Sequence, residues 1–419
     1  MWEYRRWPWF FKSGGSSSGL YITYDGGVNW KKMTDKEGLP KGDLGRIGLA
    51  IAPSNPNKVY ALIETGKKNG LYASSNGGMK WYKVSEDEQT GNRPFYYADI
   101  RVDPKNEDRI YSLWTYITRS DDGGKSWKTI TPYSRVHPDH HAMWINPDNP
   151  AHVIEGNDGG MNISYDYGAT WYFVENLPLA QFYHINVDDH LPYNVYGGMQ
   201  DNGSWVGPSS TWKRGGIRNS DWQEVFFGDG FDVVPHPSNP DIVYAMSQGG
   251  NVARIDKVTG KNNFIKPVHP EGLELRFNWD AAIAQDPNND CGLYFGSQFV
   301  HYSTDCGNSW TIISPDLTTN DSLKQLQHLS GGLTIDDTQA ENHTTILAIE
   351  PSAADKNVIW VGTDDGNLQL TTDGGTSWKN LANKLPDFEE GSWIPQIFAS
   401  KTNAGEAFVV VNDYRRNNW

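Results

Sequence analysis

Residues 120–127 read SDDGGKSW, and the spacing of Ser, Asp, Gly and Trp in this stretch decides the fold. Five further stretches follow the pattern Ser/Thr-x-Asp-x-Gly-x-x-Trp, one of them with Asn in place of Asp. They are TYDGGVNW (23–30), SSNGGMKW (74–81), SYDYGATW (164–171), STDCGNSW (303–310) and TTDGGTSW (371–378). The six copies start 51, 46, 44, 139 and 68 residues apart, and 139 is about three units of 46. The chain is therefore an internal repeat, with two degenerate units between residues 164 and 303.

Eight hairpin patterns alternate with these copies. Each has an apolar run, a turn rich in Pro, Asn and Asp, and a second apolar run, as in LAIAPSNPNKVY (49–60) and IRVDPKNEDRIY (100–111). A four-stranded antiparallel unit of about 40 to 50 residues, repeated this often, is typical of a propeller blade. The sequence therefore predicts an all-β protein, a β-propeller of four-stranded antiparallel blades with about eight blade-equivalents. The alternative is a β-solenoid, whose repeats are about half as long.

The composition fits short strands and many turns, because the 419 residues include 43 glycines, 18 tryptophans and 21 tyrosines but only 7 methionines. The formal net charge of −15 argues against nucleic acid or an anionic membrane surface as a partner, and leaves neutral polymers, cations and basic proteins. No apolar run approaches the roughly 20 residues of a membrane helix. The start, MWEYRRWPWFF, lacks the pattern of a signal peptide.

The sequence starts and ends at the same position within the repeat. EYRR occupies residues 3–6 and DYRR residues 413–416, both where the second strand of a unit leads toward the third. We expect a propeller region over residues 1–419 with blades cut at both ends. It either closes into a ring or belongs to a longer array, with parts of two adjoining propellers. Residues 5–18 and 314–345 break the regular spacing and are predicted to be loop inserts.

The repeat copies resemble Asp-boxes, which occur in sialidases, in xyloglucan-cleaving tandem-propeller glycosidases and in sortilin. Longer phrases, including DHHAMWINPDNP (139–150), GNDGG (156–160) and ISPDLTTND (313–321), are similar to a bacterial family of secreted, sortilin-like (Vps10-type) BNR-repeat proteins. The resemblance extends from about Gly14 to Asn412. It implies a β-propeller, a secreted, periplasmic or cell-surface location, and blades beyond both ends of this sequence. It indicates fold and compartment better than activity.

The aspartates of the repeat are predicted to shape turns. A carboxylate at this position accepts backbone N–H bonds within its turn, Gly supplies the unusual backbone angles, and Trp fills the space between sheets. These structural residues are Asp25, Asp122, Asp166, Asp305 and Asp373. In a propeller they occupy the turns between third and fourth strands, which leaves the opposite face for a site.

The turns on that opposite face bring acids, imidazoles, amides and aromatics toward the mouth of the central channel. Loops held by a rigid scaffold are where sites are usually built. The predicted funnel is lined by loops 137–141, 181–184, 228–232 and 278–280 and by turns between second and third strands. Its candidate ligand-binding residues are His137, His140, His141, Asp158, Gln200, Asp201, Asn202, Asp229, Trp279, Asp280 and Asp364.

Catalysis on a glycan is one chemistry that fits this set, because two carboxylates across a sugar act as acid and base in glycosidases. The resemblance to xyloglucan-cleaving enzymes implies a catalytic aspartate in an Asp-x-Gly-Gly turn. Asp158-Gly159-Gly160 resembles that turn without the intervening residue, Asp365 resembles it less well, and no second acid is matched. The alternative for Asp158, Asp201 and Asp365 is that each caps its own turn.

Metal binding and plain ligand binding are the other chemistries. Oxygens of Asp158, Asp201 and Asp229 could hold Ca²⁺. No other cofactor is expected. Zinc could bind His137, His140 and His141, with hydrogen bonds in the funnel wall as the alternative role of these histidines. Binding without catalysis would use aromatic side chains such as Trp279 for stacking, or else these aromatics pack between sheets.

Only two cysteines occur, Cys291 and Cys306. They face each other across a hairpin whose turn lies near Gln298 and Phe299. A cross-strand disulfide is therefore predicted, which suits an oxidising periplasm or exterior. Two buried free thiols are the alternative.

The leading functional hypothesis from the sequence is a secreted or cell-surface, non-enzymatic propeller module that binds protein or glycan. One alternative is a glycoside hydrolase of the xyloglucan-cleaving type that uses funnel aspartates. A second alternative is a structural subunit of a cell-surface assembly. We expect protein or glycan partners, no nucleic acid and no transmembrane segment.

Overall fold

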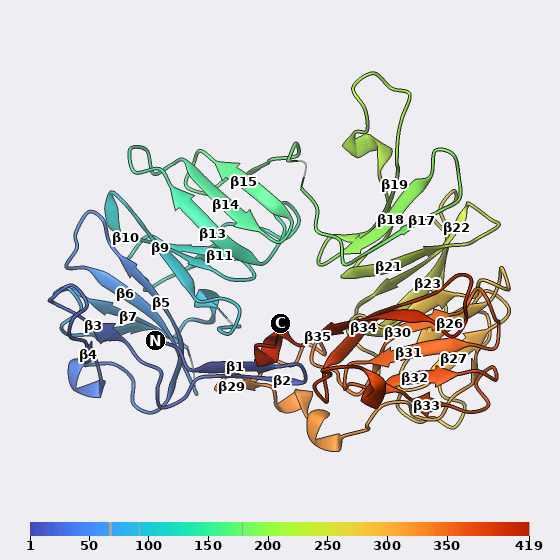
Figure 1. The fold of residues 1–419 in the computed structure, drawn as a ribbon. Coiled ribbons are helices and arrows are strands. Elements are labelled where there is room, and N and C mark those ends of the chain that lie inside the picture. Colours follow the sequence, from blue (N-terminus) through green and yellow to red (C-terminus); the bar gives the residue numbers. More distant parts are fainter. Residues whose placement is uncertain (67–68, 92, 178, 419) are drawn as a thin grey trace. The chain divides into compact units, whose positions relative to one another are not determined.

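The computed structural model describes residues 1–66, 69–91, 93–177 and 179–418, and most of its regular structure is β-strand. The chain divides into two compact units. The first unit consists of Met1–Arg6, Phe11–Pro178 and His328–Asp336. The second consists of Trp7–Phe10, Leu179–Gln327 and Asp337–Trp419. Figure 1 shows both units as sets of small sheets.

The described part of the first unit contains three four-stranded antiparallel sheets and one two-stranded sheet. The four-stranded sheets are β5 (Leu44–Ile51), β6 (Val59–Thr65), β7 (Gly70–Ser74) and β8 (Tyr82–Ser85); β9 (Asp99–Asp103), β10 (Asn106–Leu113), β11 (Ile117–Ser120) and β12 (Lys128–Thr129); and β13 (His140–Ile145), β14 (Val153–Asn157), β15 (Gly160–Ser164) and β16 (Tyr172–Phe173). The two-stranded sheet pairs β3 (Tyr21–Ile22) with β4 (Lys31–Lys32). A separate three-stranded sheet joins β1 (Tyr4–Trp7), β2 (Phe10–Ser13) and β29 (Gly331–Gly332).

The described part of the second unit contains four four-stranded sheets and one two-stranded sheet. The four-stranded sheets are β17 (His184–Val187), β18 (Asn194–Met199), β19 (Gly203–Pro208) and β20 (Gln223–Phe226); β21 (Gly230–Pro235), β22 (Ile242–Ser247), β23 (Asn251–Asp256) and β24 (Asn262–Phe264); β25 (Ile283–Gln285), β26 (Leu293–Gly296), β27 (Val300–Ser303) and β28 (Thr311–Ile312); and β30 (Ile346–Pro351), β31 (Ile359–Thr363), β32 (Leu368–Thr371) and β33 (Lys379–Asn380). The two-stranded sheet pairs β34 (Trp393–Ala399) with β35 (Ala407–Asn412).

Each four-stranded sheet is a meander in which neighbours in the chain are hydrogen-bonded neighbours in the sheet. The sheet β3–β4 holds the first copy of the repeat and corresponds to the outer two strands of a blade. The sheet β34–β35 holds the last of the hairpin patterns and corresponds to the inner two. Counted over the described residues, seven full sheets and these two halves make eight blade-equivalents. The prediction of an all-β propeller architecture with four-stranded antiparallel blades is confirmed.

Neighbouring sheets pack face to face through apolar side chains. In the first unit, one cluster joins Tyr60 of β6 to Ile100 of β9, and both side chains are at most 1% exposed. In the second unit, another cluster joins Met246 of β22 to Phe295 of β26, both fully buried. A strand with sheets on both sides buries residues of both orientations, which explains why Val59–Thr65 is buried almost continuously.

The repeat forms a turn that is closed by its own side chains, and we call it the repeat turn. In SDDGGKSW, the Ser120 hydroxyl donates to Asp122 Oδ1 and accepts the Gly124 N–H, both at 2.8 Å. Asp122 also accepts the Ser126 N–H at 2.9 Å and the Ser126 hydroxyl at 2.6 Å. The Ser126 hydroxyl and N–H lower the pKa of Asp122 to about 2. Each carboxylate of this kind is held inside its own turn.

The other aspartates of the repeat share this arrangement. Hydrogen bonds from the fourth residue after the aspartate lower the pKa to about 2 at Asp25, Asp305 and Asp373. At Asp166, partial burial opposes the shift, but the bonds from Thr170 still lower the pKa.

The tryptophans of three repeat turns donate to the glycine carbonyl of their own turn, whereas others tie one sheet to the sheet before it. Trp171 Nε1 donates to Ile130 O at 2.9 Å, and Trp310 Nε1 donates to Ile265 O at 2.6 Å. Both carbonyls directly follow the outermost strand of the preceding sheet, β12 and β24 respectively.

The predicted loop insert at residues 5–18 includes the strands β1 and β2. Phe11 of β2 is fully buried, with its ring centroid 4.3 Å from that of Phe95, and this distant contact gave no signal in the local sequence. The second predicted insert, 314–345, contains two 3₁₀ helices and the strand β29.

Eight 3₁₀ helices lie in connections of the described chain. They are η1 (Asp35–Glu37), η2 (Glu88–Thr90), η3 (Asn219–Asp221), η4 (Gln248–Gly250), η5 (Ser322–Lys324), η6 (Gln327–Leu329), η7 (Ala382–Lys384) and η8 (Tyr414–Arg416). Within the residues that the structure describes, we find no helix with the length and apolar character needed to cross a membrane.

Candidate functional site

Asp158 lies in the two-residue turn between β14 and β15. The Gly159 N–H donates to Asn157 Oδ1 at 2.9 Å and closes this turn. A Cβ on Gly159 would lie 2.5 Å from His137 Cβ, so glycine is needed for His137 to pack over the turn. Asp158 Oδ1 lies 3.3 Å from His141 Nε2, and the Asp158 side chain is 27% exposed. This carboxylate is therefore accessible to a ligand.

A second carboxylate, Asp139, lies beside Asp158. Oxygens of the two side chains come within 4.8 Å of each other. Asp139 has a φ of 65°, which is unusual for a residue with a side chain, and its N–H donates to Thr115 O at 3.2 Å. Strained backbone of this kind is common where a side chain must be held in a fixed position for function.

Tyr97 and His141 complete the surroundings of the two carboxylates. Burial, followed by a hydrogen bond to Asp139, raises the pKa of Tyr97 far above its ordinary value. The hydrogen bond to Asp158 raises the pKa of His141, although partial burial opposes this effect. The ring centroids of Tyr97 and His141 are 5.3 Å apart. The site thus combines two acids, an imidazole that favours its charged form and a neutral phenol.

His140 was predicted to line the funnel, and the structure corrects this. It is 1% exposed, and its Nδ1 lies 2.6 Å from the buried Glu155 Oε2. Glu155 Oε1 accepts Asn157 Nδ2–H at 3.0 Å and Asn162 Nδ2–H at 2.6 Å. His140 therefore braces the β13–β14 strand pair from inside and cannot reach a ligand.

The three histidines of this region do not form a zinc site. His137 Nδ1 lies 3.1 Å from Pro138 O, whereas His140 contacts Glu155 and His141 contacts Asp158. Among the described residues, no group with ligand atoms within 4.8 Å of one another includes these histidines.

The charged centre of the second unit is His184, at the start of β17. Its Nε2 lies 2.8 Å from Asp280 Oδ2, and its Nδ1 lies 3.9 Å from Asp232 Oδ1. Burial by itself would lower the pKa of His184, but the hydrogen bond to Asp280 and the charges of both aspartates raise it to about 9. Burial, partly offset by the His184 charge, raises the pKa of Asp232. His184 is therefore charged at neutral pH and lies between two acids.

Asp229 and Trp279 support each other. Trp279 Nε1 donates to Asp229 Oδ2 at 3.0 Å, and Asp229 Oδ1 accepts the Asp201 N–H at 3.0 Å. Asp229 is only 7% exposed. These contacts join the turn after β18 to the start of β21 and to the loop before β25.

Gln200 and Asn202 stabilise the same turn. Gln200 Oε1 accepts the Tyr183 hydroxyl at 2.6 Å, and Asn202 Nδ2 donates to Gln200 O at 2.8 Å. The Tyr183 ring stacks on Phe231 at a centroid distance of 4.7 Å. Burial, together with the charges of nearby aspartates, raises the pKa of Tyr183 to about 12.

Asp364 and Asp365 lie in the β31–β32 turn and are 0% and 3% exposed, which argues against the predicted ligand-binding and catalytic roles. Asp364 accepts the Thr345 N–H at 2.9 Å and Asn278 Nδ2–H at 3.0 Å. Asp365 Oδ2 accepts the Thr319 N–H at 2.7 Å. Burial, followed by the charge of Asp364, raises the pKa of Asp365. Both side chains hold the long insert against the turn and cannot contact a substrate.

The loops of the one predicted funnel are thus divided between the two units. The first unit brings together Asp139, Asp158 and His141, and the second brings together His184, Asp232 and Asp280. The sequence did not point to Tyr97, because its stretch FYY (95–97) has no catalytic pattern. Binding of Ca²⁺ by the predicted aspartates remains a prediction.

The curated relatives of the chain are named as one class of enzyme. No family model matches the chain. A xyloglucanase of Acetivibrio thermocellus is 24% identical over 400 residues, covering 87% of this chain and 40% of the relative. A xyloglucanase of a Paenibacillus species is 25% identical over 359 residues, covering 80% of this chain and 31% of the relative. The chain is distantly similar to xyloglucanases.

This chain spans 40% or less of the length of these two curated relatives. Among solved structures, the GH74 xyloglucanase from Xanthomonas campestris aligns with 99% of this chain and 58% of its own, at 14% identity and a TM-score of 0.32.

These relatives overturn the leading functional hypothesis from the sequence. A non-enzymatic binding module was expected, but the named relatives are enzymes that cleave glycosidic bonds. They favour the alternative, a glycoside hydrolase. The repeat misled the prediction because it specifies a scaffold, and a scaffold does not determine whether a site on it is catalytic.

Proposed function

We propose that this protein is a glycoside hydrolase that cleaves a neutral glucan of the xyloglucan type. The observation that carries the proposal is the accessible carboxylate pair, Asp139 and Asp158, whose oxygens come within 4.8 Å. Most glycosidases use two carboxyl groups that are roughly 5 to 9.5 Å apart. The pair here lies within 4.8 Å, below the lower end of that range. The similarity to xyloglucanases over 87% of the chain supports the choice of substrate class.

The two carboxylates have different roles in this proposal. The contact of Asp158 with His141 Nε2 at 3.3 Å favours the ionised form of Asp158, so Asp158 acts as the base or nucleophile. Asp139, the second carboxyl group of the pair, takes the part of the general acid that delivers a proton to the glycosidic oxygen. The hydrogen bond between Tyr97 and Asp139 positions the Asp139 side chain.

We also propose that the protein works outside the cytoplasm. A polysaccharide substrate is met there, and the Cys291–Cys306 disulfide suits an oxidising compartment.

Release of reducing ends from xyloglucan tests the proposal. We expect Asp158→Asn and Asp139→Asn each to lower kcat by at least about a hundredfold, which is the usual contribution of a general acid or base. Asp166→Asn is the matched control. It changes an aspartate of the same sheet whose carboxylate is held inside a repeat turn, and we expect activity close to that of the wild type.

Two results would contradict the proposal. One is full activity of folded Asp158→Asn. The other is the absence of cleavage by the folded wild-type protein across xyloglucan and related β-glucans.

A further inference from the structure

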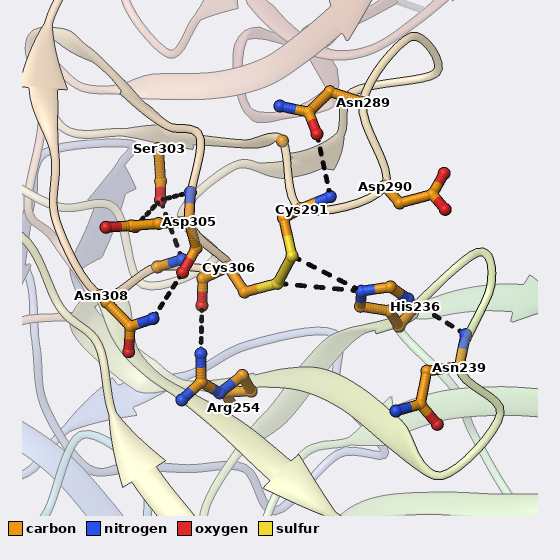
Figure 2. Close-up of a disulfide and its surroundings, with 12 residues drawn as sticks. His236, Asn239, Arg254, Asn289, Asp290, Cys291, Ser303, Asp305, Cys306 and Asn308 are labelled. Carbon is orange, nitrogen blue, oxygen red and sulfur yellow. Dashed lines mark hydrogen bonds between the residues drawn. A yellow bond between two sulfur atoms is a disulfide. The ribbon is translucent and has the colours of Figure 1, made fainter.

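The Cys291–Cys306 disulfide lies where two sheets of the second unit meet (Figure 2). Cys291 precedes β26, Cys306 lies in the repeat turn after β27, and the Cys306 N–H donates to Cys291 O at 2.9 Å. His236 approaches both sulfurs from the β21–β22 turn of the preceding sheet. Its Nε2 lies 3.9 Å from Cys291 Sγ and 3.8 Å from Cys306 Sγ.

The other ring nitrogen of His236 determines where the proton lies. His236 Nδ1 accepts the N–H of Ser238 at 3.3 Å and of Asn239 at 3.2 Å. A nitrogen that accepts hydrogen bonds carries no proton, so the neutral ring carries its proton on Nε2. The N–H of His236 therefore points at the disulfide. Neutral His236 is expected near pH 7, because burial lowers its pKa, with Asp290 opposing and Arg254 reinforcing the shift.

His236 is the residue that directly follows the first strand of its sheet. In three other sheets the residue at this position caps the turn without being a histidine. Asn146, Asp286 and Ser352 each accept, through a side-chain oxygen, the N–H of the residue two positions later, at 2.9, 2.8 and 3.1 Å. His236 does the same through Nδ1. The amide nitrogen of Asn146 contacts His152 Nδ1 at 3.3 Å, whereas the second ring nitrogen of His236 faces the two sulfurs. Capping alone therefore does not explain the histidine.

Cys306 also occupies a position that suits glycine. Four of the six repeat turns have glycine there, at Gly26, Gly77, Gly123 and Gly374, with φ between 69° and 76°. Cys306 adopts a φ of 58°, in the left-handed region that disfavours a side chain. Tyr167 takes the same position of another repeat turn with a φ of 63° and without a disulfide, so the turn itself imposes this conformation and Cys306 fits it.

We propose that Cys291–Cys306 is a thiol-exchange site, and that His236 donates its Nε2–H to the sulfur that leaves as a thiolate. A thiolate of an external dithiol attacks one sulfur, the S–S bond breaks, and its electron pair remains on the other sulfur. The second thiol of the reductant then attacks the mixed disulfide. The protein gains two electrons and two protons, and the dithiol leaves as a disulfide. His236 is thus a positioning residue that makes one cysteine of the reduced protein reactive.

The rate of reduction of the folded protein by dithiothreitol at pH 7 tests this proposal. Samples are quenched by alkylation, and mass spectrometry gives the number of alkylated cysteines. The result is unambiguous because the chain has two cysteines. His236→Asn keeps an oxygen to cap the turn, as Asn146 does, but removes the donor that faces the sulfurs. We expect this variant to be reduced at least about threefold more slowly, because a less stabilised thiolate leaves more slowly.

A second variant distinguishes the effect of the hydrogen-bond donor that faces the sulfurs from the effect of the atom that caps the turn. The amide nitrogen of glutamine reaches the place of Nε2, so we expect His236→Gln to recover part of the rate and to have a lower thiol pKa than His236→Asn after reduction. In guanidinium chloride, all three proteins should be reduced at the same rate. Equal or faster reduction of folded His236→Asn overturns the proposal. So does His236→Gln being no faster than His236→Asn, or a folded wild type that resists reduction for hours.

Discussion

At the residue scale, His184 links pH to the stability of the second unit. Its pKa in the folded protein is about 9, above the value of 6.5 that it has when unfolded. A raised histidine pKa adds stability that is fully present below the unfolded value and is lost as pH rises through the folded value. We therefore expect the free energy of unfolding to fall between about pH 6.5 and pH 9, by at most about 3 kcal/mol. Urea unfolding at a series of pH values measures this.

The control variants change one residue each. His184→Asn removes the titrating group and should flatten the pH dependence over this window. Asp280→Asn removes the carboxylate that pairs with His184 and should weaken the same pH dependence. An unaltered slope in His184→Asn would show that another group titrates in its place.

At the element scale, the repeat turn needs its aspartate as a hydrogen-bond acceptor more than as a charge. The second copy has Asn76, whose Oδ1 accepts the Lys80 N–H and the Ser74 hydroxyl, both at 2.9 Å. We expect Asp122→Asn, which keeps one acceptor oxygen, to lower the free energy of unfolding at pH 7 by less than Asp122→Ala does. Asp122→Ala removes the acceptor and should lower it by about 1 kcal/mol. Urea melts of both variants give the comparison.

Glycan cleavage should be unaffected in both variants, because the hydrogen bonds of Asp122 close its own turn. Normal melting combined with lost cleavage would instead place Asp122 in the functional site.

The blades and the repeat turns were predictable from the sequence because the signals that specify them are local. A fixed spacing of Ser, Asp, Gly and Trp describes one turn, and the pairing of Cys291 with Cys306 follows from one hairpin. The site was less predictable. The burial of His140 depends on Glu155 in the neighbouring strand, and that of Asp365 depends on Thr319 in a distant insert. Such contacts have no fixed spacing and appear only once the sheets are in place.

At the scale of the whole molecule, the net charge of −15 bears on which polymer is cleaved. An acidic protein repels anionic polymers, and the repulsion reaches about 30 Å at 0.01 M salt but only about 3 Å at 1 M. We expect xyloglucan to be cleaved at a rate that depends little on salt. Its carboxymethylated derivative should be cleaved several-fold more slowly at low salt and should approach the neutral polymer as salt is added. Equal low-salt rates for the two polymers would mean that the local field at Asp139 and Asp158 does not follow the charge of the whole chain.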